Sequence, residues 1–252
     1  MAHKSSNDLA SLAPDGWETL NLDVARRVLQ LEAEGIRALS EGLNGDFGRA
    51  VQVLAQASGR IIVSGMGKSG HIARKIAATL ASTGTPAQFV HPSEASHGDL
   101  GMITQDDAAL LLSNSGETTE LKDLIAYTRR FNIPAIGVSS RAKSSLLEAA
   151  DVALVLPATP EACPMGLAPT TSTTMMLALG DALAVALMES KGFSPDQYQV
   201  LHPGGSLGKS LIRVEDIMHA GDAVPLVAQE TPMAEVLLTM TTTGFGCGVR
   251  HR

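Results

Sequence analysis

The chain has 252 residues, of which 44% are hydrophobic and 18% are charged, a composition that supports one large folded domain with a small appendage. Its formal net charge of -7 leaves no basic face for a nucleic-acid backbone, so neither DNA nor RNA is an expected partner. Cys163 and Cys247 stand far apart with no C-x-x-C spacing, which argues against a cysteine zinc site and favours a reducing cytoplasm.

The amino-terminal segment is predicted to be helical after a short tail. Residues 1–16 are polar and lack the apolar core of a secretory signal, so we expect them to be a disordered terminus. Apolar residues then recur at helical spacing from Trp17 to Leu43, and Asp46 to Ala57 continues as a second amphipathic helix. These helices form the first part of the main domain, whose predicted bounds are residues 17–211.

After residue 60, short β-rich runs alternate with helical ones. Helices are expected near residues 69–82, 117–131 and 143–149, and the predicted strands are Arg60–Ser64, Ala87–Val90, Ala108–Ser113, Ala135–Val138 and Val152–Leu156. Such alternation is typical of βαβ units around a parallel sheet. The chain is therefore expected to belong to the α/β class.

A nearly all-apolar helix is predicted at about residues 172–190, and its lack of a polar face indicates that it is buried in a core or between subunits. Its apolar run from Met175 to Met188 is interrupted by Gly180 and Asp181 and is shorter than the roughly 20 residues that cross a bilayer. No membrane span is expected. Residues 193–211, rich in Gly, Pro and Ser, are predicted to be a long functional loop or linker.

The first candidate motif is a glycine-rich turn, Ser64-Gly65-Met66-Gly67-Lys68-Ser69-Gly70-His71, which follows a predicted strand and opens a helix. Such a turn suits an anion, because glycines let the backbone approach and the helix N-terminus offers free N–H groups. Ile62 stands where a Walker A loop needs glycine, which excludes that loop. The G-x-G-x-x-G spacing is present, but the next strand ends in Phe89-Val90-His91, where a dinucleotide site needs an acid.

A tight turn with an exposed lysine is the structural alternative for this motif. Lysine in the first turn of a helix opposes the macrodipole, so Lys68 is expected to face an anion.

The second candidate motif is a hydroxyl-rich turn, Ser113-Asn114-Ser115-Gly116-Glu117-Thr118-Thr119-Glu120, again between an apolar strand and a helix. Ser115 is predicted to cap that helix, while the Ser113 and Thr118 hydroxyls complete a phosphate cradle. An ordinary N-cap beside solvated acids is the alternative. Ligands of open α/β sheets bind at the carboxyl ends of strands, so two such turns on one sheet favour a phosphosugar or nucleotide.

The remaining candidates are scattered: His91-Pro92, His97-Gly98-Asp99, Glu161-Ala162-Cys163-Pro164 and His202-Pro203-Gly204-Gly205. Each also has an ordinary interpretation as a turn residue, a solvated loop acid or a small buried hydrophobe. From the residues alone, the prediction stops at phosphosugar or nucleotide binding.

Four segments together resemble the arabinose 5-phosphate isomerases of 3-deoxy-octulosonate (Kdo) synthesis, over about residues 20–240: GMGKSGHIARKIAATLASTGTPAQFVHPSEASHGDLGMI, SNSGETTEL, EACPMGLAPTTSTTMMLALGDALAVAL and HPGGSLGK. The resemblance implies a doubly wound, five-stranded parallel α/β SIS domain with N-terminal helices, assembled as a cytoplasmic homo-tetramer. It further implies an enzyme that interconverts D-ribulose 5-phosphate and D-arabinose 5-phosphate through an enediol. Its product would supply Kdo and hence lipopolysaccharide.

Moving a carbonyl between two sugar carbons needs a base for the α-proton, a donor or cation near the oxygens, and a group that opens the ring. The resemblance implies a Glu120 or Glu161 carboxylate as the base, Lys68 as the charge stabiliser and His202 in acid–base work or ring opening. Which glutamate takes the α-proton stays open. The substrate-binding residues that it implies are Ser69, Gly84, Thr85, His97, Ser113, Ser115 and Thr118. No cofactor or metal is required, although His91 is a candidate for an inhibitory zinc ion.

The chain departs from the family after the main domain. Family members carry two CBS modules there, whereas Val214 to Cys247 matches only the beginning of the first one. One CBS motif takes on the order of 60 residues, so we expect residues 212–252 to be a partial CBS segment, disordered and without a core of its own.

Two rival functions remain. A non-catalytic SIS sensor would bind a phosphosugar and report to a partner, but it predicts loss of the carboxylates and a helix-turn-helix at the N-terminus. Glu120 and Glu161 are present, and the first helices lack a basic recognition face. An isomerase of a related heptose or hexulose phosphate is the second rival, which the specific motifs disfavour.

Overall fold

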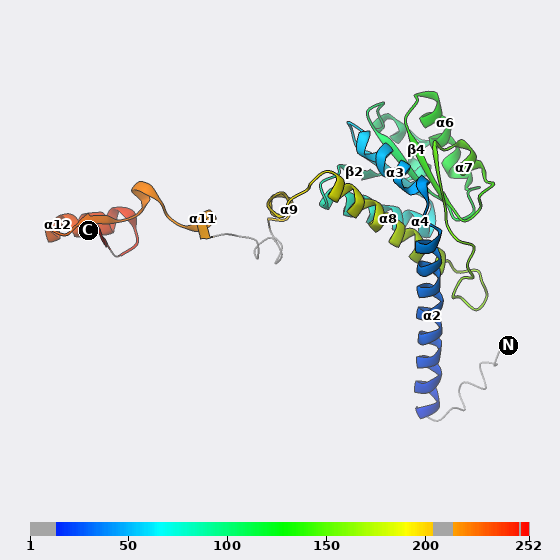
Figure 1. The fold of residues 1–252 in the computed structure, drawn as a ribbon, viewed down its shortest axis with the longest axis horizontal. Coiled ribbons are helices and arrows are strands. Elements are labelled where there is room, and N and C mark those ends of the chain that lie inside the picture. The colour runs from blue at the N-terminus through cyan, green and yellow to red at the C-terminus, as the bar shows by residue number, and fades with distance from the viewer. Residues whose placement is uncertain (1–13, 204–213, 247, 252) are drawn as a thin grey trace. The chain divides into compact units, whose positions relative to one another are not determined.

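The computed structural model describes residues 14–203, 214–246 and 248–251 (Figure 1). It divides into two compact units, Met1–Tyr198 and Gln199–Arg252. The second unit begins earlier than the predicted boundary at residue 212, and it includes His202. Helix α2 (Pro14–Gly42) begins within the tail that we expected to end at residue 16. The rest of that predicted disordered tail lies outside the described residues.

The first unit contains a five-stranded sheet whose neighbouring strands are all parallel. Its strands are β1 (Ile61–Gly65), β2 (Ala87–Phe89), β3 (Ala108–Leu112), β4 (Ala135–Ser139) and β5 (Val152–Val155), and their order is β2-β1-β3-β4-β5. The chain adds β2 on one side of β1 and then returns to add β3 on the other, so its winding reverses between β1 and β3. Open sheets bind ligands at the carboxyl ends of the strands beside such a reversal.

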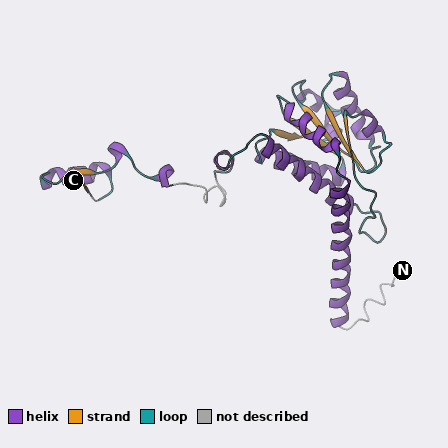
Figure 2. Cartoon of the chain, viewed as in Figure 1, coloured by secondary structure: helices purple, strands orange, loops and turns teal. Residues whose placement is uncertain are grey.

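Helices cover both faces of this sheet (Figure 2). Successive strand residues point to opposite faces, so Ile61 and Val63 enter one core while Ile62 enters the other. The first core also takes buried residues from α2, α3 (Gly45–Gln56), α4 (Gly67–Ser82) and α8 (Thr171–Ser190). The second takes them from α5 (Pro92–Ala95), α6 (Lys122–Arg130) and α7 (Ser145–Ala149). The predicted doubly wound five-stranded fold is therefore confirmed.

Helix α8 is the apolar helix that the sequence predicted to be buried. It packs against α4, α2 and α3, and its buried residues are Thr171, Ser172, Met175, Met176, Leu179, Gly180, Leu183, Ala184 and Leu187. By length and composition alone it could cross a membrane, but half of it is buried inside the unit, as in the core helix of a globular domain. Asp181 forms an ion pair with Lys75 of α4, which gives the one acid of the apolar run a partner inside the fold.

Helix α8 runs in the same direction as α4. Gly180 lies against Ile76 midway along both helices, and Lys191 beyond the end of α8 donates to the hydroxyl of Thr85 beyond the end of α4, at 3.0 Å. Since α4 starts at the carboxyl end of β1, the N-terminus of α8 also lies toward that end of the sheet. This places the loop before α8 near the side where the ligand of an open sheet is expected.

The second unit contains a small βαβ arrangement. Its described elements include α11 (Val214–Ile217), η3 (Gly221–Ala223), β6 (Leu226–Ala228), α12 (Met233–Thr243) and β7 (Val249–His251), and β6 pairs with β7 in parallel. These elements differ from the disorder that we expected of residues 212–252. Of the residues after Tyr198 whose burial is described, however, Pro225 alone is buried. In its described residues the segment thus has regular elements without a buried apolar cluster.

The close contact between α4 and α8 predicts a specific sensitivity. A Cβ at Gly180 would lie 2.3 Å from Ile76 Cγ1, so Gly180→Ala should push the two helices apart and lower the free energy of unfolding by about 1–3 kcal/mol, measured by urea denaturation. Gly48→Ala in α3 is the matched control, because a Cβ there meets nothing within 4 Å. It should raise stability by roughly 0.5–1 kcal/mol. Equal effects of the two substitutions would contradict the packing described for α8.

Candidate functional site

The glycine-rich turn joins the end of β1 directly to the start of α4. Gly67 has a φ of 58°, which favours glycine, and a Cβ at Gly70 would lie 2.5 Å from the carbonyl oxygen of Gly65. Glycines at both positions let the helix begin against the strand end. Met66, the N-cap residue, offers no side-chain hydrogen bond, and the first turn contains no acid. The first N–H groups of this 16-residue helix are therefore suited to an anion.

Lys68 and Ser69 lie in the first turn of α4, as the motif predicted. The Lys68 side chain is exposed and forms no ion pair with any residue in the described part of the chain. A positive charge at the positive end of a helix is unfavourable without a compensating anion. The geometry therefore favours a negatively charged ligand over a purely structural turn.

Three hydroxyl groups converge in the turn after β3. The buried Ser113 Oγ lies 2.7 Å from Thr118 Oγ1 and 3.5 Å from Ser115 Oγ, and it accepts the N–H of Gly116 at 3.0 Å. Gly116 has a φ of 68°, which turns the chain back toward these hydroxyls. The result is a compact hydroxyl cluster at the carboxyl end of β3.

The predicted capping role of Ser115 is wrong. Its Oγ accepts the N–H of Glu117 at 3.2 Å, inside the turn, and α6 begins only at Lys122 after a short 3₁₀ segment, η2 (Thr119–Leu121). Thr118 is extended, with a φ of -64° and a ψ of 115°, so no helix runs on from residue 117 as we expected. Ser115 therefore shapes the turn instead of starting the helix.

The end of β4 and the segment that follows it hold this turn in place through hydrogen bonds. The carbonyl oxygen of Asn114 accepts hydrogen bonds from Ser140 N at 3.1 Å, Ser140 Oγ at 2.8 Å and Ser139 Oγ at 3.1 Å. The Glu117 carboxylate accepts from Ser145 N at 2.8 Å and Ser145 Oγ at 2.7 Å. The Ser145 hydroxyl, followed by the Ser145 N–H, lowers the pKa of Glu117 below its ordinary value. Glu117 is therefore an anchor of the turn, a role that the sequence analysis missed.

Both turns lie at the point where the winding of the sheet reverses. Gly65, the last residue of β1, is paired with Leu112, the last residue of β3. The turns that follow are consequently neighbours, and the sequence-predicted residues that they bring together are Lys68, Ser69, Ser113, Ser115 and Thr118. Glu120 follows on η2, where its exposed side chain forms no hydrogen bond or ion pair with the described residues.

Glu161 lies in the loop between β5 and α8, at the N-terminus of α8. Its Oε2 accepts hydrogen bonds from Thr170 N at 2.7 Å, Thr170 Oγ1 at 3.1 Å and Ser172 N at 3.2 Å. Burial by itself would raise the pKa of this carboxyl, but the Ser172 side chain and the N–H groups of Thr170 and Ser172 outweigh burial and hold the pKa below its ordinary value. Among the described residues, the hydrogen bonds to this carboxylate thus come from Thr170 and from the Ser172 N–H.

Gly84 and Thr85 are not brought together with the two turns within one chain. They precede β2, at the amino end of the sheet, whereas the turns follow the carboxyl ends of β1 and β3. Thr85 is buried, and a Cβ at Gly84 would lie 2.4 Å from the Phe193 ring. The distance from Thr85 to the far end of β2 is about 13 Å for four residues of strand, longer than a pentose phosphate contact allows. Their assignment to the substrate site stays a prediction.

The three candidate histidines, His91, His97 and His202, occupy different surroundings. His91 precedes α5, its ring meets Phe89 edge-on with centroids 6.2 Å apart, and its buried Nδ1 has no hydrogen-bond partner in the part of the chain that the structure describes. His97 lies exposed just after α5. His202 belongs to the second unit. Among the described residues no group of three His, Cys, Asp or Glu side chains could hold a metal ion, so the zinc assignment to His91 stays a prediction without support from one chain.

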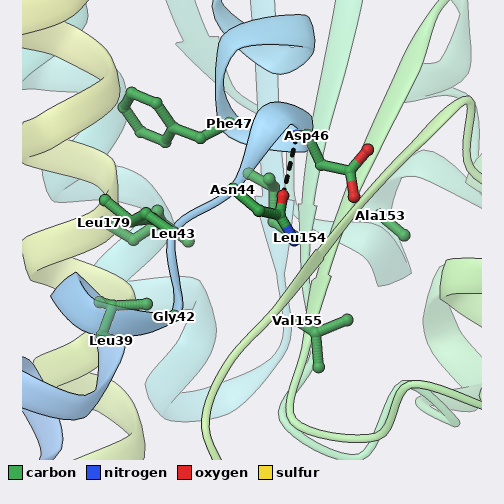
Figure 3. A pocket seen from close by; sticks show the side chains of 10 residues that line it. All are labelled: Leu39, Gly42, Leu43, Asn44, Asp46, Phe47, Ala153, Leu154, Val155 and Leu179. Carbon is green, nitrogen blue, oxygen red and sulfur yellow. Dashed lines mark hydrogen bonds between the residues drawn. The ribbon is translucent and has the colours of Figure 1, made fainter.

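A separate hollow of about 100 Å³ lies where the α2–α3 junction meets β5 (Figure 3). Asn44 caps α3 there by accepting the N–H of Asp46 at 2.8 Å, and apolar side chains such as Leu39 and Leu179 form much of the remaining wall. None of the sequence-predicted site residues lines this hollow. It is therefore distinct from the candidate site at the strand ends.

Comparisons with known proteins agree with this geometry. The model of the SIS domain family matches residues 53–186. The arabinose 5-phosphate isomerase KdsD of Yersinia pestis is 51% identical over 225 residues, which cover 89% of this chain and 69% of that protein. KdsD of Pseudomonas aeruginosa is 48% identical over 233 residues, covering 91% of this chain and 72% of that protein. The chain belongs to the arabinose 5-phosphate isomerase family of SIS-domain proteins.

A solved structure supports the same membership at the level of the fold. The c3406 protein of E. coli CFT073, in complex with arabinose 5-phosphate, superposes with a TM-score of 0.71 and 38% sequence identity, over 73% of this chain and 98% of that one.

The hydrogen bonds to Glu161 predict a pH-dependent contribution to stability. Because the folded pKa lies below the ordinary value of 4.5, the ionised carboxylate stabilises the folded chain; the effect is complete above that value and is lost as the pH falls through the folded pKa. Urea unfolding should therefore show wild type more stable than Glu161→Gln by an amount that is constant down to about pH 5 and shrinks below it. A stability difference that stayed constant to about pH 3 would contradict the interaction.

Proposed function

We propose that the chain is an aldose–ketose isomerase that interconverts D-ribulose 5-phosphate and D-arabinose 5-phosphate through an enediol intermediate. One observation carries this proposal: two anion-ready turns meet at the β1/β3 reversal in a chain about half identical to KdsD proteins. The product would supply Kdo and lipopolysaccharide synthesis in the cytoplasm. The reaction as proposed needs no cofactor.

The arrangement provides separate groups for binding and for chemistry. The hydroxyl cluster of Ser113, Ser115 and Thr118, together with the N-terminus of α4, would bind the phosphate. Lys68, in the same α4 turn, would stabilise the negative charge that develops on the sugar oxygens. Substrate and transition state share the phosphate contacts, whereas only the transition state gains from the charge stabiliser.

Two carboxylates compete for the role of base. Glu120 is exposed without a hydrogen bond to the described residues, while Glu161 has one oxygen held by three donors. Catalytic groups work best when their orientation is fixed before the substrate arrives. This contrast favours Glu161 as the base that takes the α-proton and leaves Glu120 a supporting role. His202 remains our candidate for ring opening.

Neither rival function is favoured by a specific observation. A sensor needs the phosphate site but no oriented carboxylate. The three hydrogen bonds to Glu161 would then only stabilise the N-terminus of α8. An isomerase of a longer phosphosugar would share the phosphate turns. The identity to the KdsD proteins favours the five-carbon substrate.

We also propose a homo-oligomer, with the tetramer of the family as the expected form. The apolar surface of α8 supports this less than we expected, because much of it is buried within the chain. Helix α2 supports it better: Leu22, Leu29 and Ile36 recur every seven residues and are 46%, 66% and 40% exposed. A seven-residue apolar repeat on a helix is typical of helix–helix pairing. Gly35 and Leu39, on another face of α2, already pack into its own unit.

Catalytic substitutions test the isomerase function. Wild type incubated with ribulose 5-phosphate should yield arabinose 5-phosphate, identified by NMR, and Glu161→Gln, Glu120→Gln and His202→Ala should each lower kcat by roughly 10²–10⁴-fold with smaller changes in KM. Ser115→Ala is the binding control: it removes a contact shared by substrate and transition state, so KM should rise more than kcat falls. Substrate binding without conversion by the wild-type chain would support the sensor instead.

Substitution on α2 tests the oligomer. Leu29→Glu places a charge in the exposed apolar repeat and should reduce the assembly to smaller species, measured by light scattering at micromolar concentration. Gln30→Lys places a charge at the neighbouring exposed position outside the repeat, where Glu34 can pair with it, and should leave the assembly unchanged. A monomeric wild type would refute the proposed oligomer, and an unchanged Leu29→Glu assembly would exclude α2 from its interface.

A further inference from the structure

The hydrogen bonds to Glu161 all fall on one of its two carboxylate oxygens. Thr170 N, Thr170 Oγ1 and Ser172 N donate to Oε2, and none of these bonds reaches Oε1. A carboxylate held in this way has a fixed orientation and one oxygen that remains able to accept a proton.

The Thr170 hydroxyl helps to fix the orientation of the Glu161 carboxylate. Its Oγ1 accepts the N–H of Ala162 at 2.8 Å, so its single proton is directed to Glu161 Oε2 at 3.1 Å. The hydroxyl thereby closes a ring with the backbone next to Glu161. Thr170 is also the N-cap residue of α8, yet its side chain makes no capping bond to that helix. The Glu161 carboxylate accepts the Ser172 N–H that a threonine cap would ordinarily take.

We infer that Thr170 is a positioning residue for the isomerisation: its hydroxyl holds Glu161 Oε2 so that Oε1 is the oxygen that exchanges the proton with the substrate. The inference rests on the base role proposed for Glu161. Helix α8 serves the site through its N-terminal N–H groups, and Thr170 couples the orientation of the carboxylate to the start of that helix.

The proton transfer that this geometry serves is balanced without any further reactant. Oε1 takes the proton from the carbon next to the carbonyl, the C–H electron pair becomes the C=C bond, and the carbonyl π pair moves to oxygen to give the enediolate. The hydroxyl proton on the adjacent carbon then passes to this enediolate oxygen. The O–H electron pair that it leaves forms the new C=O bond, and the C=C pair takes the same proton back from Oε1 at the former carbonyl carbon. Throughout, the donors on Oε2 favour the ionised carboxylate, which is the form that begins each cycle.

Ionisable groups are present in the loop of Glu161 and on the helices that pack against α8. The loop contributes Cys163, whose pKa is lowered first by the N–H of Ala168 and then by that of Met165. The packed helices contribute Glu32 of α2, Arg49 of α3 paired with Asp46, and Lys68, His71 and Lys75 of α4, the last paired with Asp181. The pKa of Glu161 is nevertheless set by burial, which raises it, and by the bonds from Ser172 and Thr170, which outweigh burial and lower it.

Removal of the hydroxyl at constant shape tests the inference. In the full chain, Thr170→Val keeps the backbone N–H bond to Glu161 and loses both hydroxyl bonds. We expect kcat to fall by about 10- to 100-fold with little change in KM, because the base is less well oriented. We also expect the acid limb of the pH profile of kcat/KM to move to higher pH, since one donor to the ionised carboxylate is gone.

Two controls separate positioning from stability. Thr170→Ser keeps the hydroxyl and should restore kcat and the acid limb. Thr173→Val removes a hydroxyl that bonds the carbonyl oxygens of Thr170 and Pro169 without touching Glu161, so it should resemble wild type. Should Thr170→Val fail to fold, Thr170→Ala takes its place. If Thr170→Val or Thr170→Ala kept the kcat and acid limb of wild type, the inference would be overturned. It would also be overturned if Thr170→Ser lost as much kcat as Thr170→Val.

A measurement without turnover distinguishes this inference from the proposed function. The pKa of Glu161, followed by NMR on carboxyl-labelled glutamate and assigned with Glu161→Gln, should rise in Thr170→Val and not in Thr173→Val. A wild-type chain that does not isomerise ribulose 5-phosphate would refute the proposed function. An unchanged Glu161 pKa in Thr170→Val would refute the positioning role of Thr170.

Discussion

The pairing of Gly65 with Leu112 at the ends of β1 and β3 is the constraint on which the candidate site depends. The winding of the sheet reverses between these strands, so the helices that follow them leave toward opposite faces and cannot fill the space above the strand ends. One turn offers free N–H groups and Lys68, and the other offers hydroxyls. Neither turn alone is more than a common local structure, but the register places them side by side.

This position also explains why so much hydrogen bonding lies behind the second turn. A turn that ends a buried strand and leads into a late-starting helix has carbonyl and N–H groups without helical partners. Ser139 and Ser140 satisfy the carbonyl of Asn114, and Glu117 links the turn to the start of α7 through Ser145. The loop after β4 therefore keeps the hydroxyl cluster in shape before any ligand binds. Such preorganisation lowers the cost of ordering the site on binding.

The sequence predicted the parts of the molecule that depend on residues close to one another along the chain. Five apolar runs, the strand–turn–helix sites of Lys68 and Ser113, and the buried helix α8 all carry local signals of pattern or composition. The contacts that support the site do not, because Glu117 and Ser145 are 28 residues apart, and Glu161 and Thr170 are nine apart across an irregular loop. The start of α6 was misjudged because propensity alone does not reveal that Thr118 is extended and is followed by a 3₁₀ segment.

The resemblance supplied residues that local patterns could not, and the structure separates them into two groups. Lys68, Ser113 and Ser115 lie at the carboxyl ends of the strands, whereas Gly84 and Thr85 lie at the amino end beside Phe193 and Lys191. One ligand cannot contact both ends of the same sheet. If both groups belong to one site, a second copy of the chain must supply one of them.

The lowered pKa of Glu161 imposes a compromise on the proposed chemistry. Donors on Oε2 keep the carboxylate ionised at neutral pH, so every molecule starts the cycle ready to accept a proton, but they also make it a weaker base. An α-proton of a sugar is a weak acid, and a weak base therefore needs strong stabilisation of the enediolate to reach the transition state. In the proposed mechanism that stabilisation comes from Lys68. Lys68 on α4 and the donors at the N-terminus of α8 thus have complementary tasks: one stabilises the charge on the sugar, and the other fixes the carboxylate that exchanges its proton.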